Sequence, residues 1–142
     1  MSRPSAIVRI LDANANRAIE GLRVCEEIVR FSLEEPAEFT RLRRLRHAVA
    51  GAVAGLPVSL TARLRARGSD RDVGRRAPAG RVASLEQSLV INFQRVKESL
   101  RMLEECARLL APRKTAAFQR LRFRAYEVER EALLRLATVR HR

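Results

Sequence analysis

A chain of 142 residues, 46% of them hydrophobic, has the length and apolar content for one domain with its own core. Its 32% charged residues, its lack of tryptophan and its few aromatic side chains favour long solvated helices over a β-sandwich or barrel. The net charge of +13 is almost all arginine, which fits a polyanionic partner, a small anionic ligand or a host whose codons favour arginine.

No apolar run approaches the roughly 18 residues that span a bilayer, and the N-terminal MSRPSAIVRI contains no apolar signal region. We therefore expect a cytoplasmic protein with no membrane partner. Cys25 and Cys106 fall at apolar helical positions and form no C-x-x-C unit, which predicts reduced core cysteines rather than a metal site. Few aromatic residues are available for base stacking, which disfavours a nucleic-acid partner.

Hydrophobic periodicity predicts four long helices and no strand. The first is expected from about residue 5 to residue 34, and Pro36 begins the second, which ends near Ala54 before the sequence GLP. A short helix with Ser59 as its N-cap is expected over about 59–66.

The segment that follows, RGSDRDVGRRAPAGRV (67–82), contains three glycines and one proline and is predicted to be a loop. SLEQ (84–87) is typical of a capping box and should begin the third long helix, which ends before Pro112. The last helix is predicted over about 114–139.

The chain also contains an internal repeat. NANRAIEGLRVCEEIVR (14–30) aligns without a gap with NFQRVKESLRMLEECAR (92–108), and FTRLRRLRHAV (39–49) resembles FQRLRFRAYEV (118–128). Each repeat is thus a helical hairpin, over about 7–55 and about 84–139, with a connecting segment of about 56–83. Two such hairpins most simply form one all-α domain, a pseudo-two-fold four-helix bundle.

On a helical wheel of the first repeat, one polar stripe is expected to face solvent; it contains Asn16, Glu20, Arg23, Glu27 and Arg30, with Glu26 at its edge. Asn14 and Arg17 fall instead among apolar residues, and Asn92 and Arg95 take the equivalent positions in the second repeat. Glu20 and Glu98 lie at the edge of these apolar faces, one turn from the arginines.

A buried arginine without a partner is costly, so two explanations of this pattern remain open. In the first, Asn14, Arg17 and Glu98, together with their symmetry mates, satisfy one another across the bundle. In the second, the two Asn–Arg pairs converge on an anionic ligand in a polar pocket, where Gly21 and Ser99 leave room. Planar guanidinium groups suit phosphate or carboxylate, which they bind in a bidentate manner.

The loop adds Arg67, Asp70, Asp72 and Gly74, and two of the three aspartates of the chain are here. An aspartate beside phosphates is a ligand for Mg²⁺, although ordinary turn chemistry also explains Asp and Gly in a loop. The sequence contains no phosphate-binding loop, dinucleotide fingerprint, zinc-protease or serine-hydrolase motif.

Together these residues resemble a known family. ILDANANRAIEGLRVCEEIVRF, DVG, NFQRVKESLRMLEE and FQRLRFRAYEVE are similar to the small all-helical hydroxymethylpyrimidine phosphate kinases of thiamine synthesis, over about residues 7–130. In that family the domain occurs alone, as we expect here, or fused ahead of thiamine phosphate synthase. The additional Arg75 and Arg76 after DVG depart from the family pattern at the nucleotide-facing loop.

The resemblance implies phosphorylation of hydroxymethylpyrimidine monophosphate to the diphosphate, with ATP and Mg²⁺ as cofactors. Residue by residue, it suggests that Arg17 and Arg95 clamp phosphate while Asn14 and Asn92 orient the ligand. Glu20 and Glu98 would fix the arginines or help to hold metal. Arg67 and Asp72 would close over the nucleotide phosphates, with Asp72 as the metal ligand. Arg122 and Tyr126 would line the pyrimidine pocket.

Two other functions compete with this interpretation. A chorismate-mutase-like helical enzyme also gathers arginines in a bundle to bind a small dianion. A basic helical module without catalytic activity would bind nucleic acid or a protein partner, but phosphate-backbone readers expose their cations. The partners expected under the kinase interpretation are the pyrimidine monophosphate and ATP, and a homodimer that completes the site remains open.

Overall fold

The structure, a computed structural model, describes residues 5–140, with Arg140 described by its backbone alone. Its long helices are α1 (Ala6–Ser32), α2 (Pro36–Ala54), α4 (Leu85–Leu110) and α5 (Thr115–Arg140). A short helix, α3 (Leu60–Ala66), and two 3-10 turns, η1 (Ser69–Arg71) and η2 (Pro112–Lys114), complete the secondary structure. Residues 5–140 contain no strand, so the predicted all-α class is confirmed.

Local sequence signals explain where these helices begin. Pro36 occupies the first turn of α2, where its missing N–H costs nothing. Ser59 caps α3 by accepting a hydrogen bond from the Ala62 N–H at 3.1 Å, as predicted. Ser84 caps α4 in the same way, but Gln87 accepts its return bond from the Ala83 N–H, one residue earlier than in a standard capping box.

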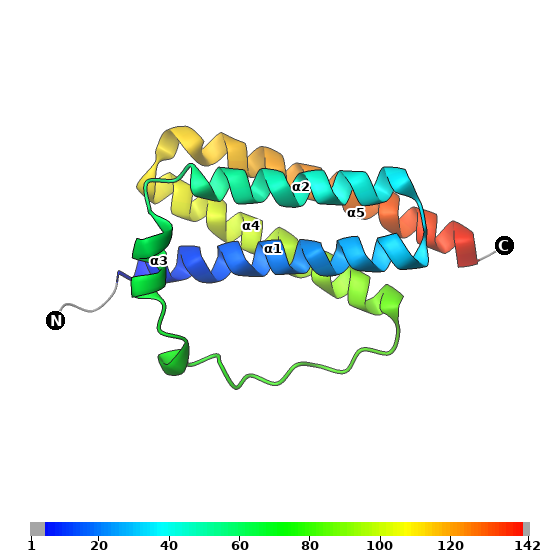
Figure 1. The fold of residues 1–142 in the computed structure, drawn as a ribbon, viewed down its shortest axis with the longest axis horizontal. Coiled ribbons are helices and arrows are strands. Elements are labelled where there is room, and N and C mark those ends of the chain that lie inside the picture. The colour runs from blue at the N-terminus through cyan, green and yellow to red at the C-terminus, as the bar shows by residue number, and fades with distance from the viewer. Residues whose placement is uncertain (1–4, 141–142) are drawn as a thin grey trace.

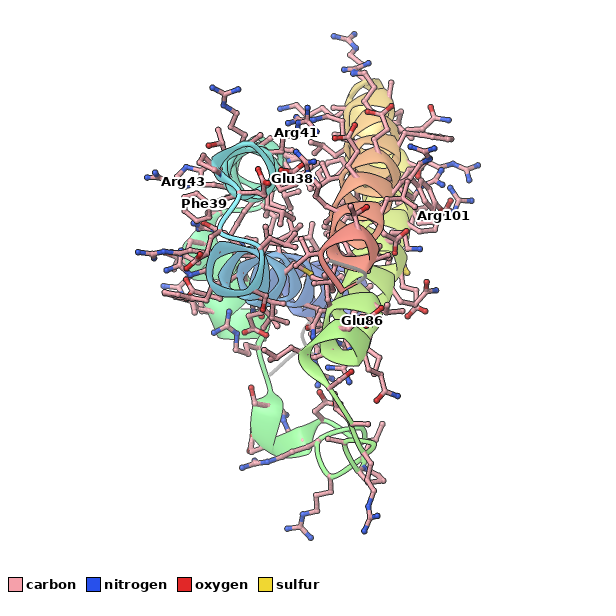
Figure 2. All side chains as sticks on the ribbon, turned by 90° about the vertical axis from the view of Figure 1, so that its right-hand side faces the viewer. Glu38, Phe39, Arg41, Arg43, Glu86 and Arg101 are labelled. Carbon is pink, nitrogen blue, oxygen red and sulfur yellow. The ribbon has the colours of Figure 1, made fainter. Side chains whose placement is uncertain are left out.

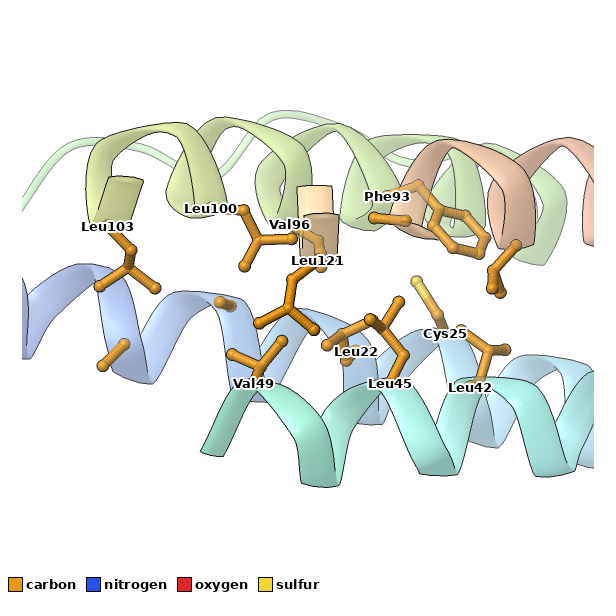
Figure 3. Close-up of a cluster of buried hydrophobic side chains, with 14 of the residues drawn as sticks. Leu22, Cys25, Leu42, Leu45, Val49, Phe93, Val96, Leu100, Leu103 and Leu121 are labelled. Atoms are coloured by element: carbon orange, nitrogen blue, oxygen red, sulfur yellow. The ribbon is translucent and has the colours of Figure 1, made fainter. Parts of the chain in front are cut away.

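The four long helices form two antiparallel hairpins, α1–α2 and α4–α5, and α1 also packs antiparallel to α4 (Figure 1). All four contribute to one cluster of buried side chains, part of which is drawn in Figure 3. Burial of these side chains is the main source of stability, at about 1.5–3 kcal/mol for each large one. The fully buried labelled residues are Leu22, Cys25, Leu42, Leu45, Val49, Phe93, Val96, Leu100 and Leu103.

The connecting segment leaves the bundle after α2. Helix α3 lies across the N-terminal end of α1, and the chain then runs along the outside of the bundle to the start of α4 (Figure 1). Every residue from 72 to 84 is exposed. The predicted loop over 67–82 is therefore correct except for the single turn of η1.

Each hairpin contains one buried carboxylate that forms an ion pair with its second helix, and the one in the first repeat, Glu26, was predicted at the edge of a solvated stripe. Glu26 is 1% exposed and accepts hydrogen bonds from Arg46 of α2, at 2.6 Å from Nε and 3.2 Å from Nη2. Its repeat equivalent Glu104 is also buried and accepts from Arg122 Nε of α5 at 3.0 Å. The wheel placed Glu26 at the edge of a polar stripe, and the second helix of the hairpin covers that edge.

These ion pairs also show how the hairpin repeat differs from the sequence alignment. The alignment of the second helices places Arg46 opposite Ala125, whereas the ion pairs make Arg46 the counterpart of Arg122. Burial nevertheless follows the alignment, since Leu42 and its aligned residue Leu121 are both buried, so Arg46 and Arg122 reach their carboxylates from different turns of the second helix. An overall pseudo-two-fold relation of the halves stays a prediction.

The contact between α1 and α4 is closest at Gly21. A Cβ atom at this position would lie 2.8 Å from Cγ2 of Val96 and 3.4 Å from the carbonyl oxygen of Asn92. The prediction that Gly21 leaves room for a ligand is therefore wrong, because Val96 fills that space. Among the residues described, no helix is both long and apolar enough to cross a membrane.

Candidate anion-binding site

One depression at the α1–α4 contact gathers residues from both repeats. It has a volume of about 290 Å³ and is lined by Asn14, Arg17, Arg95, Glu98 and Ser99. Both arginines line it because α1 and α4 run antiparallel, which brings the middle of one helix against the middle of the other (Figure 1). We name this the central depression.

The arginines of the central depression are exposed, not buried as their wheel positions predicted. A long arginine stem can pass over apolar neighbours and carry its guanidinium to solvent. Within residues 5–139, Arg17 and Arg95 have no hydrogen bond and no ion pair, and Arg17 does not contact Glu98 as the mutual-satisfaction explanation requires. Two positive charges therefore line one depression, and Glu98, the acid of that lining, forms an ion pair with neither.

The other polar residues of the predicted site have local partners. Asn14 Nδ2 donates to the Ile10 carbonyl at 2.9 Å, and Asn92 Nδ2 makes the same bond to the Ser88 carbonyl at 2.8 Å. Glu98 accepts from Gln94 Nε2 at 3.0 Å. Asn92 and Glu20 do not line the central depression.

A second depression lies between α4 and α5 and shares Glu98 with the first. Its volume is about 380 Å³, and its lining includes the predicted pair Arg122 and Tyr126; the others are Gln94, Lys97, Glu98 and Arg101. All its cations are paired with acids, including Lys97 with Glu129 at 2.9 Å and Arg122 with Glu104 at 3.0 Å. The Lys97 ammonium also lies 5.2 Å from the centre of the Tyr126 ring.

A third cluster fastens the connecting segment to α1. Asp12 is 3% exposed and accepts from Arg67 twice, at 2.7 Å from Nε and 2.8 Å from Nη2, and from Arg63 Nε at 3.0 Å. The hydrogen bonds from Arg67 lower the pKa of the Asp12 carboxyl below its ordinary value, against the opposing effect of burial. The same pairing raises the pKa of Arg67.

Arg67 also lines a depression of about 130 Å³ on the face of α1 that carries Asp12. We name it the loop depression; its lining is Arg9, Asp12, Ala13, Asn16, Arg67, Gly68, Ser69 and Asp72. Asn14 and Arg17 are not among its lining residues, and the two depressions have no lining residue in common. The loop depression and the central depression therefore adjoin around α1 without being one cavity.

Asp72, the predicted metal ligand, lies at the rim of the loop depression and is exposed. Its Oδ1 accepts from the Gly74 N–H at 2.8 Å, the turn chemistry that the sequence left open. Among residues 5–139, no three His, Cys, Asp or Glu side chains form a group that could hold a metal ion. Any Mg²⁺ here would depend on ligands supplied by the nucleotide phosphates.

Asp12 was not among the residues predicted from the sequence. Its partners Arg63 and Arg67 lie 51 and 55 residues later in the chain, so no local pattern connects them. One signal was available, since Asp12 is the only aspartate outside the loop. The two cysteines are buried as predicted, and burial raises the pKa of the Cys25 thiol to about 12.

Comparisons with known proteins agree on one family. The ThiD2 family model matches residues 9–131. Similar relatives include the thiamine-phosphate synthase of Synechocystis sp., 40% identical over 129 residues, 89% of this chain and 36% of the relative. The thiamine-phosphate synthase of Rhodopirellula baltica is 34% identical over 134 residues, 92% of this chain and 35% of the relative. The chain thus spans about a third of the length of these relatives. No solved structure matches it.

Proposed function

The chain belongs to the ThiD2 family of thiamine biosynthesis, and we propose that it is a kinase that transfers a phosphoryl group from ATP to hydroxymethylpyrimidine monophosphate. The observation that carries the proposal is the pair Arg17 and Arg95, which line one depression and form no ion pair, while Glu98 of the same lining accepts from Gln94 instead. Two cations held together in this way repel each other, and a phosphate between them converts that repulsion into binding.

The chemistry of this transfer fits such a site. The acceptor is a phosphate that is already anionic near neutral pH, so the enzyme needs no strong general base. Catalysis then depends on bringing two polyanions together and on stabilising the charge that spreads over the transferred group. Arg17 and Arg95 would bind the acceptor phosphate, and Asn14 at the same depression would orient it.

The neighbouring depressions offer places for the rest of the reactants. In the depression between α4 and α5, the aromatic ring of Tyr126 and the paired cation Arg122 would line the pyrimidine. Glu98 lines both this depression and the central depression, so the two sites adjoin there. Arg67 would bind the nucleotide phosphates in the loop depression. Asp72 would provide one carboxylate to a Mg²⁺ that the phosphates mainly hold, and this ion would neutralise part of their charge.

The direct test is to incubate the protein with ATP, Mg²⁺ and the pyrimidine monophosphate and to follow the diphosphate by phosphorus NMR. Arg17→Gln should lower kcat/KM by roughly 100-fold or more, as expected when a charge-stabilising group is removed. Arg43→Gln is the matched control, because Arg43 is an exposed arginine on the outer side of α2 (Figure 2).

Two results would count against the proposal. If wild-type protein at high concentration forms no diphosphate, the kinase function is wrong. If Arg17→Gln and Arg43→Gln are equally active, the central depression is not the site of transfer, whatever the activity of the wild type.

A further inference from the structure

Asp12 pairs with two arginines, although one would neutralise its single negative charge. One buried carboxylate receives two guanidinium groups, Arg63 and Arg67, so the three side chains together carry a net charge of one positive unit. Arg63 is 12% exposed and does not line the loop depression, whereas Arg67 is 37% exposed and does. The two arginines are therefore not equivalent, and only Arg67 can reach a ligand.

The hydrogen bonds of Arg67 fix its orientation. It meets Asp12 side-on, through Nε and Nη2, and a guanidinium has five N–H donors in a rigid plane. Two of these point at the carboxylate, which leaves three, including both on Nη1, for another acceptor. The edge of Arg67 opposite Asp12 is thus held in place and unoccupied by any residue described.

The surroundings of that edge contain a second arginine and uncharged hydrogen-bonding groups, with Asp72 as the one acid of the lining besides Asp12. Arg9 lies across the loop depression with its Nη2 at 3.4 Å from the Gly68 carbonyl, and Asn16 and Ser69 add uncharged hydrogen-bonding groups to the lining. Without Arg63, the pair of Asp12 and Arg67 would be neutral and would attract an anion weakly. With Arg63 bound to the same carboxylate, the charge of Arg67 remains available.

We propose that Asp12 is a positioning residue for a polyphosphate site in the loop depression: it holds Arg67 with free N–H groups directed at the ligand, and Arg63 compensates its charge. The inference extends the proposed kinase function, because the nucleotide triphosphate is the natural ligand of this chemistry. It does not require that phosphoryl transfer take place here, since binding of a polyphosphate chain alone tests it.

The probe is inorganic tripolyphosphate, titrated into the whole chain by calorimetry. Arg63→Gln should weaken binding about tenfold, the size of one charge-assisted interaction, although Arg63 does not touch the ligand. Arg65→Gln is the matched control, since it removes the same charge from the same short helix without contacting Asp12; it should change affinity less than about twofold.

Asp12→Asn gives an outcome that distinguishes positioning from simple charge. Removal of a negative charge should strengthen a purely electrostatic attraction for tripolyphosphate. If Asp12 positions Arg67, the variant should instead bind about tenfold more weakly, and Asp12→Glu should recover part of the loss. Tighter binding by Asp12→Asn, or equal losses in Arg63→Gln and Arg65→Gln, would overturn the proposal.

NMR signals of Arg67 distinguish a positioning role of Asp12 from a purely structural one. The Arg67 Nε–H signal should keep its position when tripolyphosphate is added, since its bond to Asp12 persists, while the Nη signals shift. If the Nε–H signal shifts strongly, or if no Arg67 signal responds, Asp12 does not position Arg67 for this ligand. This measurement uses wild-type protein, so a folding defect in a variant cannot obscure it.

The tripolyphosphate-binding results and the kinase assay test two different proposals. An absence of diphosphate product in the presence of normal tripolyphosphate binding would reject the kinase and keep the site. Conversely, full kinase activity with an unchanged KM for ATP in Asp12→Asn would reject the positioning role and keep the kinase.

Discussion

Arg46 of α2 and Arg17 of α1 carry the same charge, but only Arg46 forms an ion pair with a carboxylate. Arg46 binds the buried Glu26, as Arg122 binds Glu104, and each pair joins the two helices of a hairpin. Arg17 and Arg95 line the central depression between the hairpins, where they form no ion pair with Glu98 or with any other acid among the residues described. The paired arginines therefore join helices of the fold, whereas the unpaired ones are exposed and available to a ligand.

The strongest test of this contrast is Glu26→Ala, because it leaves the partly buried Arg46 without its acid. The free energy of unfolding should fall by about 3 kcal/mol. Glu27→Ala, the adjacent residue whose ion pair is the surface bridge to Arg23, should lose less than about 1 kcal/mol. Urea unfolding followed by circular dichroism measures both. Equal losses would mean that burial of the ion pair contributes nothing to stability.

Arg95→Gln tests the other half of the comparison. The variant should lose roughly 100-fold in kcat/KM, equivalent to about 2.7 kcal/mol, while its free energy of unfolding stays within about 0.5 kcal/mol of wild type or rises. Arg122→Gln should destabilise the protein by about 2 kcal/mol, because it leaves the buried Glu104 with only Arg101. Destabilisation by Arg95→Gln would show that Arg95 has a structural partner after all.

Gly21→Ala tests whether the close approach of α1 and α4 brings the two unpaired arginines together. Alanine favours a helix by about 1 kcal/mol over glycine, but its Cβ would collide with the stiff Val96 side chain at 2.8 Å. We expect a net loss of about 1–2 kcal/mol together with reduced activity.

Gly51→Ala is the matched control for Gly21→Ala. Gly51 lies in α2, and a Cβ atom added to it would meet nothing within 4 Å, so the variant should gain about 0.5–1 kcal/mol. Thermal unfolding reports both changes. A stabilising Gly21→Ala would imply that the helices separate easily, in which case the central depression is not set by this contact.

The smallest expected effect concerns pH and Asp12, the buried carboxylate that joins α1 to the connecting segment. The pKa of Asp12 in the folded protein is below its ordinary value of 3.8, so its contribution to stability is present above about that pH. It is lost as the pH falls through the folded-state value. Asp12→Asn should therefore make the free energy of unfolding less dependent on pH below about 4. An unchanged acid profile in the variant would contradict the linkage.

The sequence predicted well the features that depend on interactions between residues close together in the chain. Pro36, Ser59 and Ser84 mark helix starts through local backbone chemistry, and the structure places the starts there. The repeat also identified Asn14, Arg17 and Arg95, because two copies of one polar anomaly point to a shared environment. The functional roles of these residues stay predictions.

What could not be predicted depends on contacts between distant segments. A helical wheel gives the direction of a Cβ atom, but it cannot say whether a neighbouring helix covers that direction, as α2 covers Glu26. Nor does it say where a long side chain ends, so Arg17 was placed in the core when its guanidinium is exposed. Asp12 was missed because both of its partners come from the connecting segment.

That connecting segment has a consequence for how the halves of the molecule stay together. From residue 72 to residue 84 it is fully exposed and lies outside the bundle, while the two hairpins bury their side chains against each other (Figure 1). Its later part therefore acts as a tether. It raises the effective concentration of one hairpin for the other and adds little contact energy of its own. A change in the length of the stretch after Asp72 should alter that concentration only weakly, by about 0.6 kcal/mol for a doubling, so this part can change in length without disturbing the interface that it joins.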